Sequence, residues 1–276
     1  MIPPGLALDF TRASRARVYN YLLGGKSWTE VDRETAQALI QTSPDAPDVA
    51  GENFKFSGRG TAWAVAEFGI RQVFDIGVGI TDDVPLDSVE TCVHNVDPGA
   101  MVLAFDPDEV VLAHARALRP GYGGVLRGDV RDLDTIFDNP GLHHPDLAGR
   151  IDLSRPAVVV LAAVLHFVDD PAAVMAQLRR RLAPGSVVIL SHATKTSAER
   201  VDGMTKAYER GNSSITFRDE ETIAALADGW DLPSPGLVDV QLWSPDGTYQ
   251  GEVYDTVRVV GMVAVVPGGP APSGRR

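Results

Sequence analysis

The sequence holds a single cysteine, Cys92, among its 276 residues. One thiol excludes a disulfide framework and a cysteine-based zinc site within the chain. The adjacent His143 and His144 would point apart and form a poor chelate, so we expect no metal. No apolar run approaches the ~20 residues that span a membrane, and no basic region followed by an apolar stretch opens the chain. We therefore expect a cytoplasmic protein that has no membrane partner.

Positive charge is also scarce. Lys and Arg number 25 against 37 Asp and Glu, which gives a formal net charge of −12. Binding to a nucleic-acid backbone needs clustered positive charge, and the arginine cluster 179–181 ends a predicted amphipathic helix, where cations suit the helix dipole. The charge balance argues against DNA or RNA and favours a small-molecule substrate.

From Arg71 onward, apolar segments of strand length alternate with helical segments. Strands are predicted over 72–76, 101–105, 123–127, 157–163, 186–191, 236–242 and 256–265. Helices are predicted over 108–118, 131–137, 171–182, 197–210 and 219–228. Such alternation implies a parallel sheet, whereas the turn at Ser244–Gly247 joins the last two strands as a hairpin. We predict an α/β fold: a Rossmann-like seven-stranded, mostly parallel sheet with an antiparallel C-terminal strand and helices on both faces.

The first sixty residues form an N-terminal helical extension that precedes the sheet. Helical spacing predicts three helices, over residues 14–23, 32–40 and 48–68. Gly24-Gly25 would end the first helix, and the third would be interrupted near Gly58 and Gly60. We expect a cap segment (1–60), a main domain (61–266) and a disordered tail (267–276). The cap segment could also pair two copies as a homodimer.

An Asp-x-Gly-x-Gly turn follows the first predicted strand. Gly77 and Gly79 leave room for a ligand to approach the backbone, and Asp75 lies where an amino group of that ligand would be. Asp82 stands where the dinucleotide fingerprint has its third glycine, which favours S-adenosylmethionine (SAM) over NAD. The alternative is a tight turn that binds nothing.

Two further strand ends carry acids. The second strand ends at Asp106-Pro107, where a carboxylate can accept both ribose hydroxyls of an adenosine group. The third strand is followed by Asp129-Val130, which can accept the adenine amino group. Because parallel strands end at one edge of a sheet, we expect these acids beside the glycine turn. Alternatively, Asp106 only starts a helix and Asp129 only caps the helix 131–137.

The fourth and fifth strands lead to histidines. The apolar run of the fourth strand ends near Ala162, whose backbone would line the sulfonium, and His166 would then face the acceptor. His192 follows the next strand. An imidazole can change charge near neutral pH, so both rings are candidates for a general base. A histidine after an apolar strand can also be purely structural.

Five blocks of sequence carry a family resemblance. The most specific is residues 17–26, RVYNYLLGGK, and the others are 111–118, 128–132, 163–168 and 190–194. Together they resemble the actinobacterial SAM-dependent methyltransferase family long catalogued as DUF574. The resemblance implies that the N-terminal segment closes over the cofactor cleft.

The same resemblance implies roles for the N-terminal block. Tyr21 would be catalytic, and the acceptor would be contacted by Tyr19, Gly24, Gly25 and Lys26. A packing motif at the sheet edge is the alternative. Two departures from the family occur: the glycine turn continues as residues 80–85 without Leu-Pro-Thr, and residues 52–53 lack the family's arginine.

We therefore predict a SAM-dependent methyltransferase that acts on an O or N atom of a small molecule, with secondary metabolism as the expected setting. Its product would be S-adenosylhomocysteine. SAM is already activated, so the protein has to align the acceptor and exclude water. Two alternatives remain: another sulfonium reaction, such as aminocarboxypropyl transfer or a rearrangement, and a protein of this fold that only binds a ligand.

Overall fold

The fold is built on a seven-stranded mixed sheet. The computed structural model describes residues 10–80, 87–118, 125–147, 149–211 and 213–269. Its strands are β1 (Gln72–Ile76), β2 (Met101–Asp106), β3 (Val125–Arg127), β4 (Val158–Leu161), β5 (Val187–Thr194), β6 (Val238–Asp239) and β7 (Arg258–Val265). Their order is β3-β2-β1-β4-β5-β7-β6, with β1 to β5 parallel and β7 antiparallel to both neighbours. The predicted fold class is confirmed.

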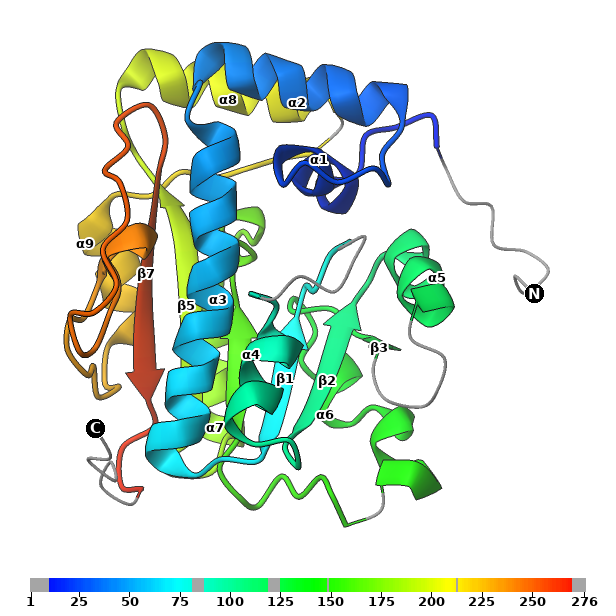
Figure 1. Cartoon of the computed structure of the whole chain (residues 1–276), viewed down its shortest axis with the longest axis vertical. Helices are drawn as coiled ribbons and strands as arrows, with labels where there is room; N and C mark the ends of the chain where they lie inside the picture. Colours follow the sequence, from blue (N-terminus) through cyan, green and yellow to red (C-terminus); the bar gives the residue numbers. More distant parts are fainter. Residues whose placement is uncertain (1–9, 81–86, 119–124, 148, 212, 270–276) are drawn as a thin grey trace.

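Helices cover both faces of this sheet (Figure 1). The helices are α1 (Arg15–Leu22), α2 (Glu30–Thr42), α3 (Ala46–Phe68), α4 (Val89–Val96), α5 (Glu109–Leu118), α6 (Asp134–Phe137), α7 (Pro171–Arg181), α8 (Ala198–Arg210) and α9 (Glu220–Ala224). Side chains of α3 and α4 join one buried cluster, and those of α6 and α7 join the cluster on the opposite face. A parallel sheet needs both faces covered because its central strands are apolar throughout.

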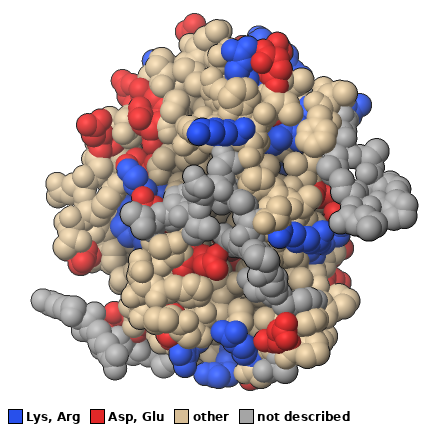
Figure 2. Space-filling model, turned by 45° about the vertical axis from the view of Figure 1, so that its right-hand side comes forward, with Lys and Arg blue, Asp and Glu red and all other residues tan. Residues whose placement is uncertain are grey.

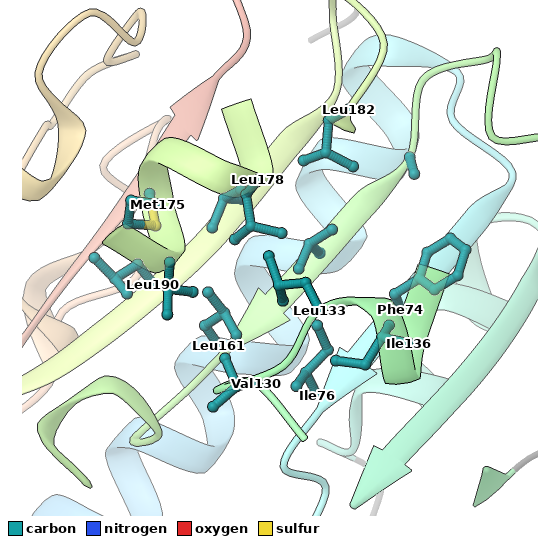
Figure 3. Close-up of a cluster of buried hydrophobic side chains, with 14 of the residues drawn as sticks. Phe74, Ile76, Val130, Leu133, Ile136, Leu161, Met175, Leu178, Leu182 and Leu190 are labelled. Carbon is teal, nitrogen blue, oxygen red and sulfur yellow. The ribbon is translucent and has the colours of Figure 1, made fainter. Parts of the chain in front are cut away.

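The central strands of the sheet are buried on both faces. All four side chains of β4 are fully buried, since alternate residues enter opposite clusters. Figure 3 shows one cluster, in which strand residues meet α6 and α7; its labelled members are Phe74, Ile76, Val130, Leu133, Ile136, Leu161, Met175, Leu178, Leu182 and Leu190. This packing holds the carboxyl ends of β1, β2 and β4 in fixed positions.

The N-terminal helices cover those carboxyl ends. In Figure 1, α2 and α8 lie side by side above the sheet, and α1 lies beneath α2. Arg17 and Asp32 join α1 to α2 by a 2.7 Å ion pair whose side chains are 3% and 0% exposed. Asp32 also completes a capping box with Thr29 at the start of α2. The helical extension is therefore a packed part of the fold.

Four details differ from the prediction. Helix α3 runs without a break through Gly58 and Gly60, because both are packing sites: a Cβ on Gly58 would lie 2.3 Å from the Asp87 carbonyl oxygen. The expected boundary at residue 60 therefore falls inside one helix. Helix α4 was not predicted, and β6 is only two residues long. Of the tail expected to be disordered, residues 267–269 are described, and 270–276 lie outside the described residues, as do 81–85 of the altered turn.

Among the helices of the described ranges, none is long and apolar enough to cross a membrane. Within the same ranges, no three His, Cys, Asp or Glu side chains gather as a metal site would require.

Candidate active site

A cavity of about 630 Å³ lies between the carboxyl ends of β1, β2 and β4 and the N-terminal helices. That volume is typical of a small-molecule site. Polar groups from the strand ends line one part, namely Asp75, Gly77, Gly79, Asp106, Asp108, Asp129 and Arg131. The apolar compartment is the other part, lined by Leu22, Leu39, Ala46, Val49, Ala50, Ala193, Met204, Ile215, Phe217, Val257 and Val259. The two parts together offer room for a polar and an apolar ligand.

Asp106 is a buried acid of the polar part. Its carboxylate accepts the Gly79 N–H at 3.1 Å and the Asp108 N–H at 2.9 Å, and the residue is only 6% exposed. Burial, together with the charges of Asp108 and Asp129, raises the pKa of Asp106 to about 6 in spite of these hydrogen bonds. A carboxylate has about four lone-pair directions, so about two stay open toward the cavity.

The glycine turn needs left-handed backbone. Gly77 and Gly79 have φ of +78° and +65°, a region that costs other residues free energy. A Cβ on Gly77 would lie 2.7 Å from Val164 Cγ2, whereas a Cβ on Gly79 would meet nothing within 4 Å. Gly77 therefore serves close packing, and Gly79 leaves open space at the cavity wall. Asp75, at the penultimate position of β1, lines the same wall.

The end of β4 holds one strained residue. Ala163 has φ of +56°, and it is the non-glycine residue with positive φ among those described. Its N–H donates to the Ser191 hydroxyl at 2.8 Å, which holds the turn in place. Ala162, Ala163 and Val164 all line the cavity. Strain of this kind collects at ligand sites, because only the surrounding structure maintains it.

Asp129 and Val130 line the cavity beyond β3, as does Pro107 after β2. The Asp129 carboxylate is held by Arg131, whose Nε lies 2.9 Å and 3.0 Å from its two oxygens. Burial alone would raise the pKa of Asp129, but the hydrogen bonds from Arg131 outweigh it and the pKa is lowered. An adenine amino group would compete with Arg131 for the same oxygens.

The two predicted histidines have different surroundings. His166 lines the cavity, and its Nδ1 accepts the Ala193 N–H at 3.3 Å. His192 is fully buried outside the described lining; its Nδ1–H donates to the Ala193 carbonyl at 2.8 Å and its Nε2 accepts from Arg218 at 2.9 Å. Burial lowers the pKa of His166 far below its usual value and that of His192 to about 4. Both rings are neutral, and both nitrogens of His192 are occupied.

The N-terminal block ties the cap to the sheet. Tyr19 lines the cavity wall, and its hydroxyl donates to the Ala50 carbonyl at 2.9 Å and accepts from Asn53 at 2.8 Å. Asn20 donates to the Ile80 carbonyl at 3.2 Å, which attaches α1 to the glycine turn. A Cβ on Gly25 would collide with the Asn20 side chain, so this glycine allows the contact.

Other residues of the block lie outside the described lining of the cavity. Tyr21 packs edge-on against Trp28, with ring centroids 5.1 Å apart. Gly24, at φ +76°, ends α1, and both Gly24 and Lys26 are exposed. The structure thus places Tyr19 in the cavity lining. The other residues predicted from this block lie outside that lining, namely Tyr21, Gly24, Gly25 and Lys26.

The sequence reasoning assigned no hydrogen-bonding role to several polar residues in and around the site. Arg15, Asn53, Ser191 and Tyr208 come from α1, α3, β5 and α8, and Arg218 comes from the segment between α8 and α9, so only the fold brings them together. Arg218 donates to the Val168 carbonyl at 3.0 Å and to the Asp169 carbonyl at 3.2 Å, which holds the loop that carries His166. No local motif marks such residues, although Ser191 lies within the block 190–194 and Asn53 belongs to the pair 52–53 that departs from the family.

A comparison with family profiles decides the identity of the chain. The profile described as S-adenosyl methyltransferase matches residues 4–267. The chain belongs to this S-adenosyl methyltransferase family. It is accordingly a SAM-dependent methyltransferase, and the resemblance to the DUF574 family is confirmed.

Two solved structures from actinobacteria resemble this methyltransferase over nearly its whole length. A DUF574 family protein from Streptomyces avermitilis shares 28% identity with a TM-score of 0.84, covering 95% of this chain and 100% of the other. A candidate methyltransferase from Thermobifida fusca shares 30% identity with a TM-score of 0.82, covering 97% and 100%. Among curated sequences, none matches.

A more distant structure supports the fold alone. The plantazolicin methyltransferase BamL, solved with S-adenosylhomocysteine, shares 9% identity with a TM-score of 0.53 and covers 91% of this chain and 95% of its own. In the methyltransferase described here, the residues present suit SAM. The space beside Gly79 is open, and the buried Asp106 carboxylate retains free acceptor positions next to it.

Proposed function

We propose that this methyltransferase acts on an O or N atom of a small, largely apolar molecule, in the setting of secondary metabolism. The observation that carries the proposal is the division of one cavity into a polar part at the strand ends and the apolar compartment under the helices. A charged cofactor suits the first part, and an apolar acceptor suits the second. An apolar acceptor that fills the apolar compartment would itself displace water from the methyl group.

On this proposal, residues at the strand ends hold the cofactor. Asp106 would accept the ribose hydroxyls, Asp129 and Val130 would border the adenine, and Asp75 with the two glycines would face the methionine part. Pro107 and Ala162 complete the wall. When bound, SAM supplies an electrophilic methyl group on a positively charged sulfur.

The N-terminal helices would hold the acceptor. The apolar compartment takes side chains from α1, α2, α3, α8 and β7, so its shape depends on how the cap is seated. Tyr19 and Asn20 fix that seating through α3 and the glycine turn. The protein would then align the acceptor with the methyl group mainly by shape.

We further propose that nucleic acid is not a substrate and that the protein acts in the cytoplasm. The formal net charge is −12, and on the face shown in Figure 2 the described Lys and Arg lie in separate groups among Asp and Glu. A nucleic-acid interface would instead gather positive charge in a continuous stripe. Pairing of two copies through the cap stays a prediction.

The test is product analysis with a panel of apolar acceptors. The purified protein would be incubated with SAM and each acceptor, and the nucleoside products would be separated by chromatography. S-adenosylhomocysteine that forms only with an acceptor supports the proposal. Methylthioadenosine would show transfer of the aminocarboxypropyl arm instead, and SAM binding without either product would contradict the proposed acceptor class.

A further inference from the structure

Three hydrogen-bond donors surround one aromatic ring in the cavity wall. Arg15 from α1, His166 after β4 and Tyr208 from α8 all line the cavity, and so does Phe167 between them. The Arg15 guanidinium lies 4.3 Å from the centre of the Phe167 ring. The rings of His166 and Tyr208 lie edge-on to it, at centroid distances of 4.3 Å and 5.6 Å.

Arg15 carries a positive charge, and within the described residues it forms no ion pair with an acid. Its one hydrogen bond there is a long one, 3.5 Å to the Ser214 carbonyl. The acid that acts on it is Asp129, which is already held by Arg131. A half-buried guanidinium stacked on an aromatic ring keeps its in-plane N–H groups for an anionic partner.

His166 can only donate toward the cavity. Its Nδ1 accepts a backbone N–H, so the proton of the neutral ring is on Nε2. No described residue accepts a hydrogen bond from Nε2. This ring is therefore a fixed donor, because the nitrogen that could act as a base is occupied by Ala193.

The Tyr208 hydroxyl completes the group. Within the described residues it has no hydrogen-bond partner, and burial raises the pKa of Tyr208 to about 12, which keeps its proton in place. Three donors thus surround the Phe167 ring, and the Tyr208 oxygen is the one acceptor that these three side chains leave open. They lie where the strand ends meet the apolar compartment, which holds Met204, Ile215 and Phe217 nearby.

We propose that Arg15, His166 and Tyr208 bind a carboxylate carried by an otherwise apolar acceptor. This inference rests on the proposed function and names the chemical class of its substrate. A carboxylate can accept from all three donors, whereas an ammonium group would face the positive charge of Arg15 with only the Tyr208 oxygen to accept from it. The same chemistry exists in the methionine carboxylate of the cofactor, so the test has to separate these two sources.

The experiment measures binding of three probes that share one ring system. Isothermal titration calorimetry would compare 1-naphthoate, 1-naphthamide and 1-naphthylmethylamine, each with and without saturating S-adenosylhomocysteine. Binding of S-adenosylhomocysteine itself would be measured separately. We expect naphthoate to bind roughly tenfold to a hundredfold more tightly than the amide, as charge-assisted hydrogen bonds require, and the amine to bind most weakly.

Variants then assign the preference to the three donors. Arg15→Gln should abolish the advantage of naphthoate over naphthamide and leave S-adenosylhomocysteine binding unchanged. Tyr208→Phe, which retains the ring, should weaken naphthoate severalfold and spare the amide. The matched control is Arg180→Gln, an exposed arginine of α7 that should change nothing. Thermal melts of all variants show whether each is folded.

The outcomes separate this inference from the proposed function. Equal binding of naphthoate and naphthamide by the wild type, or no binding of either, overturns the carboxylate site. So does an Arg15→Gln variant that loses S-adenosylhomocysteine but retains naphthoate, because Arg15 would then hold the cofactor. If the wild type prefers naphthoate but does not bind S-adenosylhomocysteine, the carboxylate site stands and the proposed function fails.

Discussion

Asn53 on α3 accepts a 2.5 Å hydrogen bond from the hydroxyl of Ser191 on β5, across 138 residues of chain. Ser191 in turn accepts the N–H of the strained Ala163, and Asn53 donates to the Tyr19 hydroxyl. One buried chain of hydrogen bonds therefore runs from the N-terminal cap to the end of β4. It links the element that covers the cavity to the strand end that lines it.

The first prediction concerns this chain. Tyr19→Phe should lower the free energy of unfolding by about 1–3 kcal/mol, because it leaves the Asn53 amide and the Ala50 carbonyl without their partner. Tyr21→Phe is the control: its hydroxyl has only a 3.5 Å contact with Gln37, which is too long to contribute much. Urea unfolding of both variants measures the difference. If both variants lose the same free energy of unfolding, the hydrogen bonds of Tyr19 do not stabilise the fold more than the contact of Tyr21 does.

The second prediction compares two arginines of the cap. Arg17→Met should destabilise the protein by roughly 3–5 kcal/mol, since Asp32 would keep an unpaired charge in a buried place. Arg33→Met removes the partner of Glu30 on the exposed face of α2 and should leave the urea midpoint almost unchanged. If the two variants unfold at the same urea concentration, the Arg17–Asp32 pair does not hold the cap in place.

The third prediction separates backbone strain from ligand contact. Gly69 and Gly79 have nearly the same positive φ, +64° and +65°, and a Cβ on either would meet nothing within 4 Å. Alanine at either position should therefore cost a similar ~1–2 kcal/mol of stability. Only Gly79→Ala should weaken S-adenosylhomocysteine binding, because its methyl group would project into the cofactor space. Calorimetry that finds both variants bind like the wild type would place the cofactor elsewhere.

The fourth prediction is a pH dependence of stability. The pKa of Asp106 is raised from its usual 3.8 to about 6 by burial, so the folded state favours the protonated acid. The resulting stabilisation is complete below about pH 4 and is lost as pH rises through about 6, by on the order of 3 kcal/mol. Relative to Asp106→Asn, the wild type should therefore become less stable from pH 4 to 7. Parallel stability curves would refute this.

Ligand binding should show the opposite trend. Ribose hydroxyls donate to an ionised carboxylate, so the affinity for S-adenosylhomocysteine should fall as pH drops from 7 toward 5 and Asp106 takes up a proton. Asp106→Asn should bind weakly and with little change over that range. A wild-type affinity that stays constant from pH 7 to 5 would argue against contact between Asp106 and the ribose.

The sheet was predictable because its signal is local. The first two strands are apolar runs that carry Asp75 and Asp106 at or next to their ends, and Asp129 follows the third strand by two residues. The break predicted in α3 was wrong because glycine within a helix signals either flexibility or close packing, and only the tertiary contact of Gly58 with Asp87 tells which. Helix α4 was missed although its start carries a capping signal, since Ser88 accepts the Thr91 N–H and Glu90 lies in the first turn.

The polar contacts of the cavity were less predictable. His166 and His192 have the same sequence context, a histidine after an apolar strand, yet one lines the cavity and the other is enclosed by Arg218. Tyr19 and Tyr21 are two residues apart and so lie on different faces of α1, but the sequence does not say which face meets the sheet. Such differences depend on packing between distant segments.

The most direct test of the account is a crystal structure of the protein soaked with S-adenosylhomocysteine. We expect the ribose within hydrogen-bond distance of Asp106, the backbone of Gly79 beside the nucleoside, and the apolar compartment free for an acceptor. Nucleoside density elsewhere on the protein, or a cavity that stays empty at saturating ligand, would contradict the placement of the cofactor at the ends of β1 and β2.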